Sequence, residues 1–231
     1  MTFLTPFSPD GEPHFVSANA FKAVELDATR LRRSFVLRRP LAVVGIIILA
    51  AYLLLGIFGP LLVGDPILTN PSKSLQPPSP DQLFGTDKFG RDVFARALYA
   101  IRLDMTMGIT IAIGALVVGS IIGVVAGYWG GGVDEVIMRL TDVVLAFPGF
   151  VLALILVAVM GNTIPNVVIA VTVAYIPYFI RLTRAEVLAQ RELEYVDGAR
   201  LAGNRPWRVA FRHVMPNSLR PSLVQATLVA G

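Results

Sequence analysis

Long stretches without a single charged residue constrain this chain more than any other feature of its sequence. They cover residues 40–64, 105–133, 143–180 and 221–231, nearly half of the 231 residues. Only 16% of all residues are charged and 55% are hydrophobic, whereas soluble domains carry about 25% charged residues. A disordered chain would be poorer in hydrophobic residues. The sequence therefore predicts an all-α fold, a polytopic bundle of transmembrane helices.

The lengths of the uncharged stretches predict where the chain crosses the bilayer. A spanning helix needs about 20 apolar residues, so 143–180 is too long for one span, and residues 161–166 supply a turn that divides it. The predicted order is a cytoplasmic N-terminal tail 1–40, a first span 41–63, an external loop 64–105, and a core 106–231 with spans at about 106–126, 143–160, 164–180 and, in part, 219–231.

Arginine placement predicts the orientation of these spans. The segment 181–220 holds eight arginines against four acids, and 30–39 holds five arginines and no acid. Because positive loops remain in the cytosol, both segments should be cytoplasmic, which requires an even number of crossings between them. Four spans meet this requirement, and the N-terminus is then cytoplasmic. The net charge of +4 follows from topology, so we expect no nucleic-acid partner.

Several kinds of chemistry are disfavoured by the residues present. The chain has no cysteine and only two histidines, His14 and His213, so we expect no disulfide, metal site or cofactor. A GxxxxGK[ST] phosphate-binding loop is absent, and no GxSxG or HExxH pattern suggests an intramembrane hydrolase. A transporter driven by an ion gradient is an alternative, but 105–133 and 143–180 lack the ionisable midplane residue that such proteins use. We expect a protein that is not an enzyme.

The segment 184–217 has the most informative local pattern. Residues 184–202 have helical composition, and Gly203 is a natural C-terminal stop. Asn204 and Pro206 suit the cap and first turn of a second short helix, which Pro216 is predicted to end. This second helix is basic and aromatic. It is either a solvated loop with arginines placed for topology or a docking surface for a partner, and its aromatic residues favour docking.

Residues 194–217, EYVDGARLAGNRPWRVAFRHVMPN, resemble the EAA motif of permease subunits of binding-protein-dependent ABC importers. Asp197-Gly198-Ala199 stands where the family has Glu-Ala-Ala, and Gly198 should weaken the helix by up to about 1 kcal/mol relative to alanine. The resemblance implies a cytoplasmic coupling helix that docks on the ATP-binding subunit. The residues that it implicates are Glu194, Asp197, Gly198, Ala199, Arg200, Gly203, Arg205, Trp207, Arg208, Arg212, His213 and Pro216.

Within this segment the predicted roles differ. Asp197 and Arg200 would fix the turn, while Arg205, Trp207 and Arg208 would face the ATPase surface.

Residues 84–102, FGTDKFGRDVFARALYAIR, are similar to an external stretch of the dipeptide, oligopeptide and nickel permeases. The resemblance implies contacts with the substrate-binding protein through Asp87, Arg91, Asp92 and Arg96. The same segment carries an apolar stripe bordered by arginines, which is typical of an amphipathic helix at the membrane surface. A landing surface for the binding protein and a simple interfacial anchor both remain open.

Small residues recur every fourth position in the second span and predict a close helix contact. They are Ala115, Gly119, Gly123 and Gly127. Their neighbour would belong to the same subunit or to a partner permease. Pro148 and Pro177 are expected to interrupt the third and fourth spans. Asp142, at the cytosolic mouth of the third span, would either reach water or contribute to a gate.

The resemblance covers residues 31–231 and implies a permease of the type I ABC importer kind. Such a subunit forms half of a translocation pore with a homologous permease subunit, is driven by two ATP-binding subunits, and receives substrate from an external substrate-binding protein. It implies short peptides as substrate, with nickel or another small solute as the alternative. The expected location is the inner or plasma membrane of a prokaryote. Relatives continue through a sixth span, so we expect the sequence to be truncated in the fifth.

Overall fold

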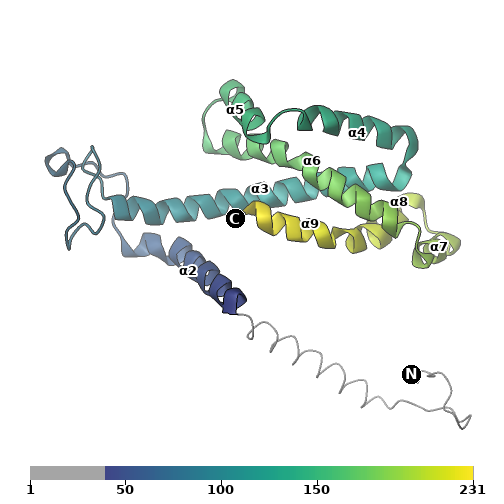
Figure 1. Ribbon diagram of the computed structural model, residues 1–231, viewed down its shortest axis with the longest axis horizontal. Coiled ribbons are helices and arrows are strands. Elements are labelled where there is room, and N and C mark those ends of the chain that lie inside the picture. The colour runs from purple at the N-terminus through teal and green to yellow at the C-terminus, as the bar shows by residue number, and fades with distance from the viewer. Residues whose placement is uncertain (1–39, 231) are drawn as a thin grey trace, which may run out of the picture. The chain divides into compact units, whose positions relative to one another are not determined.

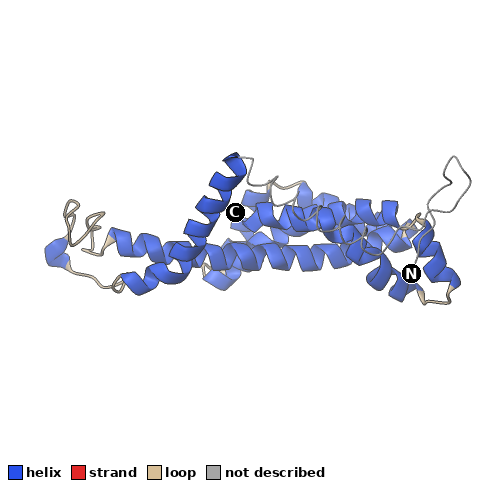
Figure 2. Cartoon of the chain, turned by 90° about the horizontal axis from the view of Figure 1, so that it is seen from below, coloured by secondary structure: helices blue, strands red, loops and turns tan. Residues whose placement is uncertain are grey.

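The structure, a computed structural model, describes residues 40–230. The predicted N-terminal tail, with its arginines at 30–39, therefore lies outside the described residues. Within 40–230 the regular elements are all helices, as Figure 2 shows. The described residues fall into two compact units, residues 40–99 and 100–230.

In the first unit, α2 (Pro40–Leu62) corresponds to the first predicted span. A compact loop follows, with one 3₁₀ turn, η1 (Pro71–Lys73). The helix α3 then begins at Val93. A Cβ atom at Gly59 of α2 would lie 3.2 Å from a terminal methyl of Leu98, so glycine allows α2 to pack directly on the start of α3.

The helix α3 (Val93–Trp129) is a single element of 37 residues. We expected a separate amphipathic helix before a span at 106–126, and the structure joins the two. The physical reason is that residues 93–107 contain neither glycine nor proline, so nothing interrupts the backbone hydrogen bonds. At 1.5 Å per residue the helix is about 55 Å long, which exceeds the hydrocarbon thickness of a bilayer.

The third predicted span, 143–160, is not one helix. The chain forms α4 (Gly131–Leu145) and α5 (Gly149–Met160), which are bent by 86° relative to each other. Pro148, which lacks an N–H, stands at this bend. By length and composition, the described residues contain three helices that could cross a membrane, α2, α3 and α6, or four if the bent pair is one span. The four crossings required by the arginine pattern depend on this pair.

The helix α6 (Ile164–Gln190) starts at the predicted boundary but continues ten residues beyond the predicted end at 180. Asn166 donates hydrogen bonds from Nδ2 to the carbonyls of Met160 and Gly161, at 2.6 and 2.9 Å, which closes the turn from α5. Pro177 lies inside α6 without ending it, contrary to the expected interruption. The remaining elements are α7 (Glu194–Leu201), α8 (Pro206–Arg208), the π-helical η2 (Val209–Val214) and α9 (Met215–Ala230).

The second unit is organised around α6. Figure 1 shows α4 and α5 along one side of α6, with α3 and α9 on the other. Glycines of α3 face α6: a Cβ atom at Gly119 would lie 2.5 Å from Cβ of Phe179, and one at Gly123 would lie 2.8 Å from the carbonyl oxygen of Ile180. The backbones can therefore approach closely only because these side chains are absent.

Three buried hydroxyl groups join the same helices. Thr183 of α6 donates to Oγ of Ser120 in α3 at 3.2 Å, and its Oγ1 lies 2.9 Å from Oγ of Ser222 in α9. All three residues are almost fully buried. Because hydroxyl groups in an apolar interior need partners, this cluster fixes the relative positions of α3, α6 and α9.

Candidate coupling site

The segment 191–217 folds as two helical pieces joined by a tight turn. The helix predicted over 184–202 is broken, because α6 ends at Gln190 and α7 starts at Glu194. Gly203 has a φ of +78°, the left-handed conformation that favours glycine just after a helix. Asn204 does not cap the next helix. It donates from Nδ2 to the carbonyl of Ala199 at 2.9 Å, and Arg205 is the residue before α8.

The second piece is longer than predicted, because Pro216 does not end it. The helical path runs from Pro206 through η2 and α9 to Ala230, with Pro216 in the first turn of α9 and Pro221 inside it. Proline is tolerated in a first turn, so Pro216 starts α9 after the π-helical stretch. The second piece of the segment therefore continues, without an intervening loop, into the helix that re-enters the predicted membrane region.

Buried valines anchor the segment to the helix bundle. Val196 of α7 and Val209 and Val214 of η2 are fully buried in one cluster with Val124 of α3 and Val187 of α6. Each fully buried valine contributes about 1.5–3 kcal/mol relative to an exposed one. The two pieces of the segment are therefore held against the ends of α3 and α6. Figure 1 shows α7 and α8 gathered at that end of the bundle.

Polar contacts add to this anchor. The guanidinium of Arg200 lies 5.8 Å from the ring centre of Tyr128 in α3, and its Nη1 donates to Asp197 at 2.9 Å. Arg191 donates from Nη1 to the carbonyl of Gly127 at 2.9 Å, near the end of α3. The contribution of Tyr128 and Arg191 was missed by sequence reasoning, although Arg191 stands among the arginines that the topology argument counted.

The outward face of the segment is basic and aromatic. Trp207 is 56% exposed, and Arg205 and Arg208 are exposed beside it. Shallow hollows flank Trp207, one lined with Gly203, Asn204, Arg205 and Arg208, and the other with Arg208, Phe211, Arg212 and Pro216. Of the other predicted coupling residues, Glu194, Asp197, Gly198 and Arg200 are exposed, while Ala199 and His213 are half-buried. Exposed tryptophan and arginine side chains, such as Trp207, Arg205 and Arg208, are the types that most often anchor protein interfaces.

Two ion pairs connect α4 to α6 next to this site. The carboxylate of Asp134 accepts two hydrogen bonds from Arg184, and Asp142 accepts one from Nη2 of Arg181 at 2.5 Å. The first pair is half-buried, and the second is exposed. Asp142, expected to face water or a gate, is thus paired. Sequence reasoning treated Arg181 and Arg184 as topological signals, and no local pattern predicted their partners 39 and 50 residues away.

The external loop holds its charged residues in mutual contacts. Asp87 accepts hydrogen bonds from the backbone N–H groups of Phe89 and Arg91 and from the side chains of Arg91 and Arg96. Burial would raise the pKa of Asp87, but these hydrogen bonds outweigh it and hold the pKa well below its usual range. Asp92 accepts from the N–H groups of Phe94 and Ala95 and so caps the start of α3. The four predicted contact residues thus shape this loop.

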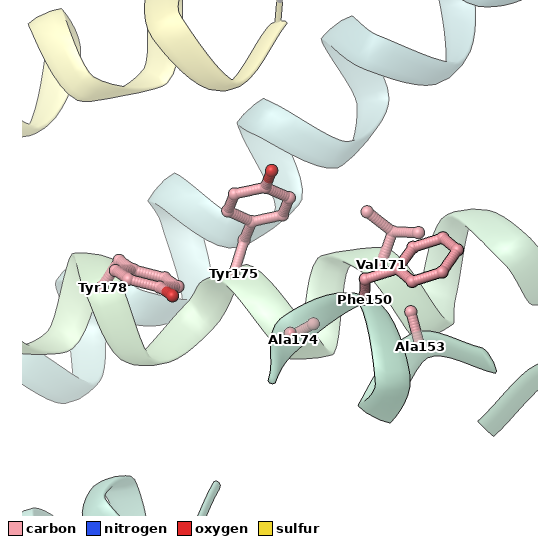
Figure 3. A pocket seen from close by; sticks show the side chains of 7 residues that line it. Phe150, Ala153, Val171, Ala174, Tyr175 and Tyr178 are labelled. Atoms are coloured by element: carbon pink, nitrogen blue, oxygen red, sulfur yellow. The ribbon is translucent and has the colours of Figure 1, made fainter. Parts of the chain in front are cut away.

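A cavity of about 310 Å³ lies between α5 and α6. Figure 3 shows Phe150 and Ala153 from α5 on one side and Val171, Ala174, Tyr175 and Tyr178 from α6 on the other. The walls are mostly apolar, with two phenol hydroxyl groups. The cavity's two walls are consecutive helices, which the short turn at residues 161–163 joins.

Comparison with known proteins identifies the chain's relatives. Residues 119–231 match the family described as binding-protein-dependent transport system inner membrane component, and residues 31–78 match the N-terminal TM domain of oligopeptide transport permease C. The dipeptide transport system permease protein DppC of Alkalihalophilus pseudofirmus is 43% identical over 195 residues, which cover 84% of this chain and 64% of that protein.

Two further relatives agree with this assignment. A Brucella suis protein named as a peptide transport system permease is 41% identical over 89% of this chain and 68% of its own length. The glutathione transport system permease protein GsiD of Pectobacterium atrosepticum is 40% identical over 67% of this chain and 51% of its own length. The chain thus spans about two thirds of the length of the first relatives that it matches.

The resemblance found in residues 84–102 and 194–217 is therefore confirmed at the level of the family, and the all-helical fold agrees with it. The protein is a multi-pass membrane protein. The chain belongs to the family of inner membrane components of binding-protein-dependent transport systems, whose members among its relatives are named as dipeptide and peptide permeases.

Proposed function

We propose that this chain is the permease subunit of an ABC importer for short peptides, in the inner membrane of a prokaryote. It forms half of the translocation pathway with a homologous permease subunit, receives peptide from an external substrate-binding protein, and is driven by two ATP-binding subunits. The names of its relatives support the peptide class, since they include dipeptide and glutathione permeases. The arginine pattern supports a cytoplasmic N-terminus and a cytoplasmic segment 181–220.

The observation that carries this proposal is the two-sided construction of the coupling segment. Its inner side, with Val196, Val209 and Val214, is buried against α3 and α6, whereas its outer side presents Trp207 between two arginines. A force applied to the outer side is transmitted to the bundle because a close-packed core does not deform smoothly. The basic outer surface fits an acidic, apolar cleft on the ATPase subunit.

Helix contacts within the second unit extend this coupling. The Thr183 cluster joins α6 to α3 and α9, and the Asp134–Arg184 pair joins α6 to α4. When the ATPase subunits close on ATP, we expect α3, α4, α6 and α9 to move together as a rigid group. Access to the pathway then alternates between its two sides, with a substrate affinity that differs between the two states.

The docking role is tested by changing the outer face without touching the buried anchor. Arg205→Glu, Arg208→Glu and Trp207→Ala are combined, and the ATPase activity stimulated by loaded binding protein is measured on the reconstituted complex. We expect this stimulation to be lost, together with co-purification of the ATPase subunits. Arg139→Glu is the control, because Arg139 is an exposed arginine of α4 outside the segment. Retained stimulation in the triple variant would refute docking through this face.

The substrate and the energy source are tested separately. The complex is purified with its binding protein, and the bound ligand is identified by mass spectrometry; we expect a short peptide, and nickel or another small solute would contradict the peptide assignment. Uptake is also measured after collapse of the proton gradient at constant ATP. Continued uptake is expected, and its loss would favour a transporter driven by an ion gradient.

We also propose that the external loop is the landing surface for the binding protein. Lys88 and Phe89 are exposed at its tip, next to the Asp87 network that supports its shape. Lys88→Glu combined with Phe89→Ala should weaken binding-protein stimulation of the ATPase while leaving basal ATPase activity unchanged. Unaltered stimulation would leave the loop as an interfacial anchor.

A further inference from the structure

The helical path from Pro206 to Ala230 is interrupted by one stretch of a different geometry. Between α8 and α9, the six residues of η2 (Val209–Val214) form a π-helix. The N–H of Met215 at its end donates to the carbonyl of Ala210, five residues earlier, where an α-helix would use the carbonyl four residues earlier. π-helical turns are rare and accommodate one extra residue in a helix.

The extra residue changes which side chains share a face. In an α-helix, residues seven apart lie within about 20° of each other, since two turns take 7.2 residues. Trp207 and Val214 are seven apart, so an uninterrupted α-helix would place both on the buried face. Val214 is 0% exposed, whereas Trp207 is 56% exposed. One residue corresponds to about 100°, and the π-helical turn thus rotates Trp207 away from the core.

Burial and a proline both favour the π-helical turn at this position. Val209 and Val214 are five apart and would lie about 140° apart in an α-helix, yet both are fully buried in the same cluster. Bonding across five residues brings them onto one face. Pro216 follows directly: in an α-helical turn its ring would clash with the carbonyl of Arg212, and it has no N–H to offer that carbonyl.

We propose that Pro216 is a positioning residue, which together with the π-helical turn sets the rotation of Trp207 and Arg208 relative to α9. The turn points the docking side chains outward while Val209 and Val214 remain in the core. The functional consequence of this inference rests on the proposed docking role of the segment. Pro221 provides a matched control, because it also lies inside the continuous helix but seven residues beyond the end of the π-helical stretch, whereas Pro216 is only two residues beyond it.

Thiol labelling measures this rotation directly, since the chain has no cysteine of its own. Single cysteines are placed at Trp207 and, separately, at Val214, in the full chain in inside-out membrane vesicles that lack the ATPase subunits. We expect fast maleimide labelling at 207 and slow labelling at 214. Pro216→Ala should slow labelling at 207 by about tenfold, since the residue turns toward the core, and Pro221→Ala should leave it unchanged. Equal labelling at 207 in both proline variants would overturn the proposal.

Two further readouts keep the outcome clear. Fast labelling at 214 in Pro216→Ala would indicate that the variant has lost its fold. In that case Pro216→Ser, which also restores the N–H, is measured instead. Loss of the fold in both variants would count against a positioning role. In the assembled complex, stimulated ATPase activity should fall in Pro216→Ala and persist in Pro221→Ala. A labelling change with unaltered ATPase activity would refute docking through Trp207 and leave the positioning role of Pro216 standing.

Discussion

Replacement of Gly119 by alanine should force α3 and α6 apart. A Cβ atom at Gly119 would lie 2.5 Å from Cβ of Phe179 and 2.9 Å from the carbonyl oxygen of Ile176. Carbon atoms in contact prefer about 3.5–4.0 Å, so the new methyl group falls short of a normal contact by about 1 Å. Neither obstacle is the flexible end of a side chain, and relief therefore requires a shift of the helix backbones.

The magnitude follows from two opposing effects. Overpacking of a well-packed core costs typically 1–3 kcal/mol, while alanine improves the helix by up to about 1 kcal/mol over glycine. We expect a net destabilisation of about 1–2 kcal/mol for Gly119→Ala. Gly114→Ala should be milder, because its Cβ would lie 3.1 Å from a methyl of Thr172. Gly132→Ala in α4 meets nothing within 4 Å and should be neutral or stabilising.

Reversible denaturation of the purified protein in detergent mixtures provides the measurement. The free energies of unfolding should rank Gly119→Ala lowest, then Gly114→Ala, then Gly132→Ala. If Gly119→Ala were as stable as Gly132→Ala, the close approach of α3 to α6 would be wrong. If Gly119→Ala did not fold, Gly114→Ala against Gly132→Ala would still decide the question.

Three other changes test the ion pair, the external loop and the turn. Asp134→Asn leaves the half-buried Arg184 without its partner and should lower the free energy of unfolding by about 1–3 kcal/mol. The charge swap Asp134→Arg with Arg184→Asp should recover part of this loss in a double-mutant cycle. A swapped protein no more stable than the single variants would contradict the pairing. The lowered pKa of Asp87 means that the ionised carboxylate stabilises the external loop fully above about pH 4, and this stabilisation is lost as pH falls through the folded pKa. Residues 64–92 should therefore be cleaved by protease faster in Asp87→Asn than in the parent protein at pH 7, and the difference in cleavage rate should shrink in acid. A difference in rate that does not depend on pH would refute this. Gly203→Ala, at a φ of +78°, should reduce the stability measured by thermal unfolding by about 1–2 kcal/mol. Gly198→Ala, with open space around its Cβ position, should increase it by up to about 1 kcal/mol. The reverse order of stabilities would contradict the turn geometry.

Local patterns predicted the parts of the fold that depend on nearest neighbours. The first span, the turn at 161–163 and the start of α6 follow from apolar length and from glycine and proline signals. The turn at Gly203 also follows, because a left-handed residue after a helix is a local requirement. The family was recognisable for the same reason, since its motifs are continuous in the sequence.

Element boundaries near Pro148, Pro177 and Pro216 could not be predicted in this way. Each proline removes one donor, but whether the helix bends, continues or begins there depends on the surrounding packing. Pro148 stands at a bend of 86°, Pro177 lies within a continuous helix, and Pro216 follows a π-helical turn. The same residue type thus has three outcomes, although Pro148 and Pro216 are both exposed and only Pro177 is buried, so residue type and burial alone do not distinguish them.

The sequence by itself determined that this is an all-helical membrane protein with a basic, aromatic segment at residues 205–213, because apolar length, charge and motif spacing are properties of the linear chain. Only the tertiary structure decided how that segment is held. The buried cluster of Val124, Val187, Val196, Val209 and Val214 combines residues from four elements, and the pair of Asp134 with Arg184 spans 50 positions. Such contacts arise from close packing between helices, and no local periodicity specifies which faces meet.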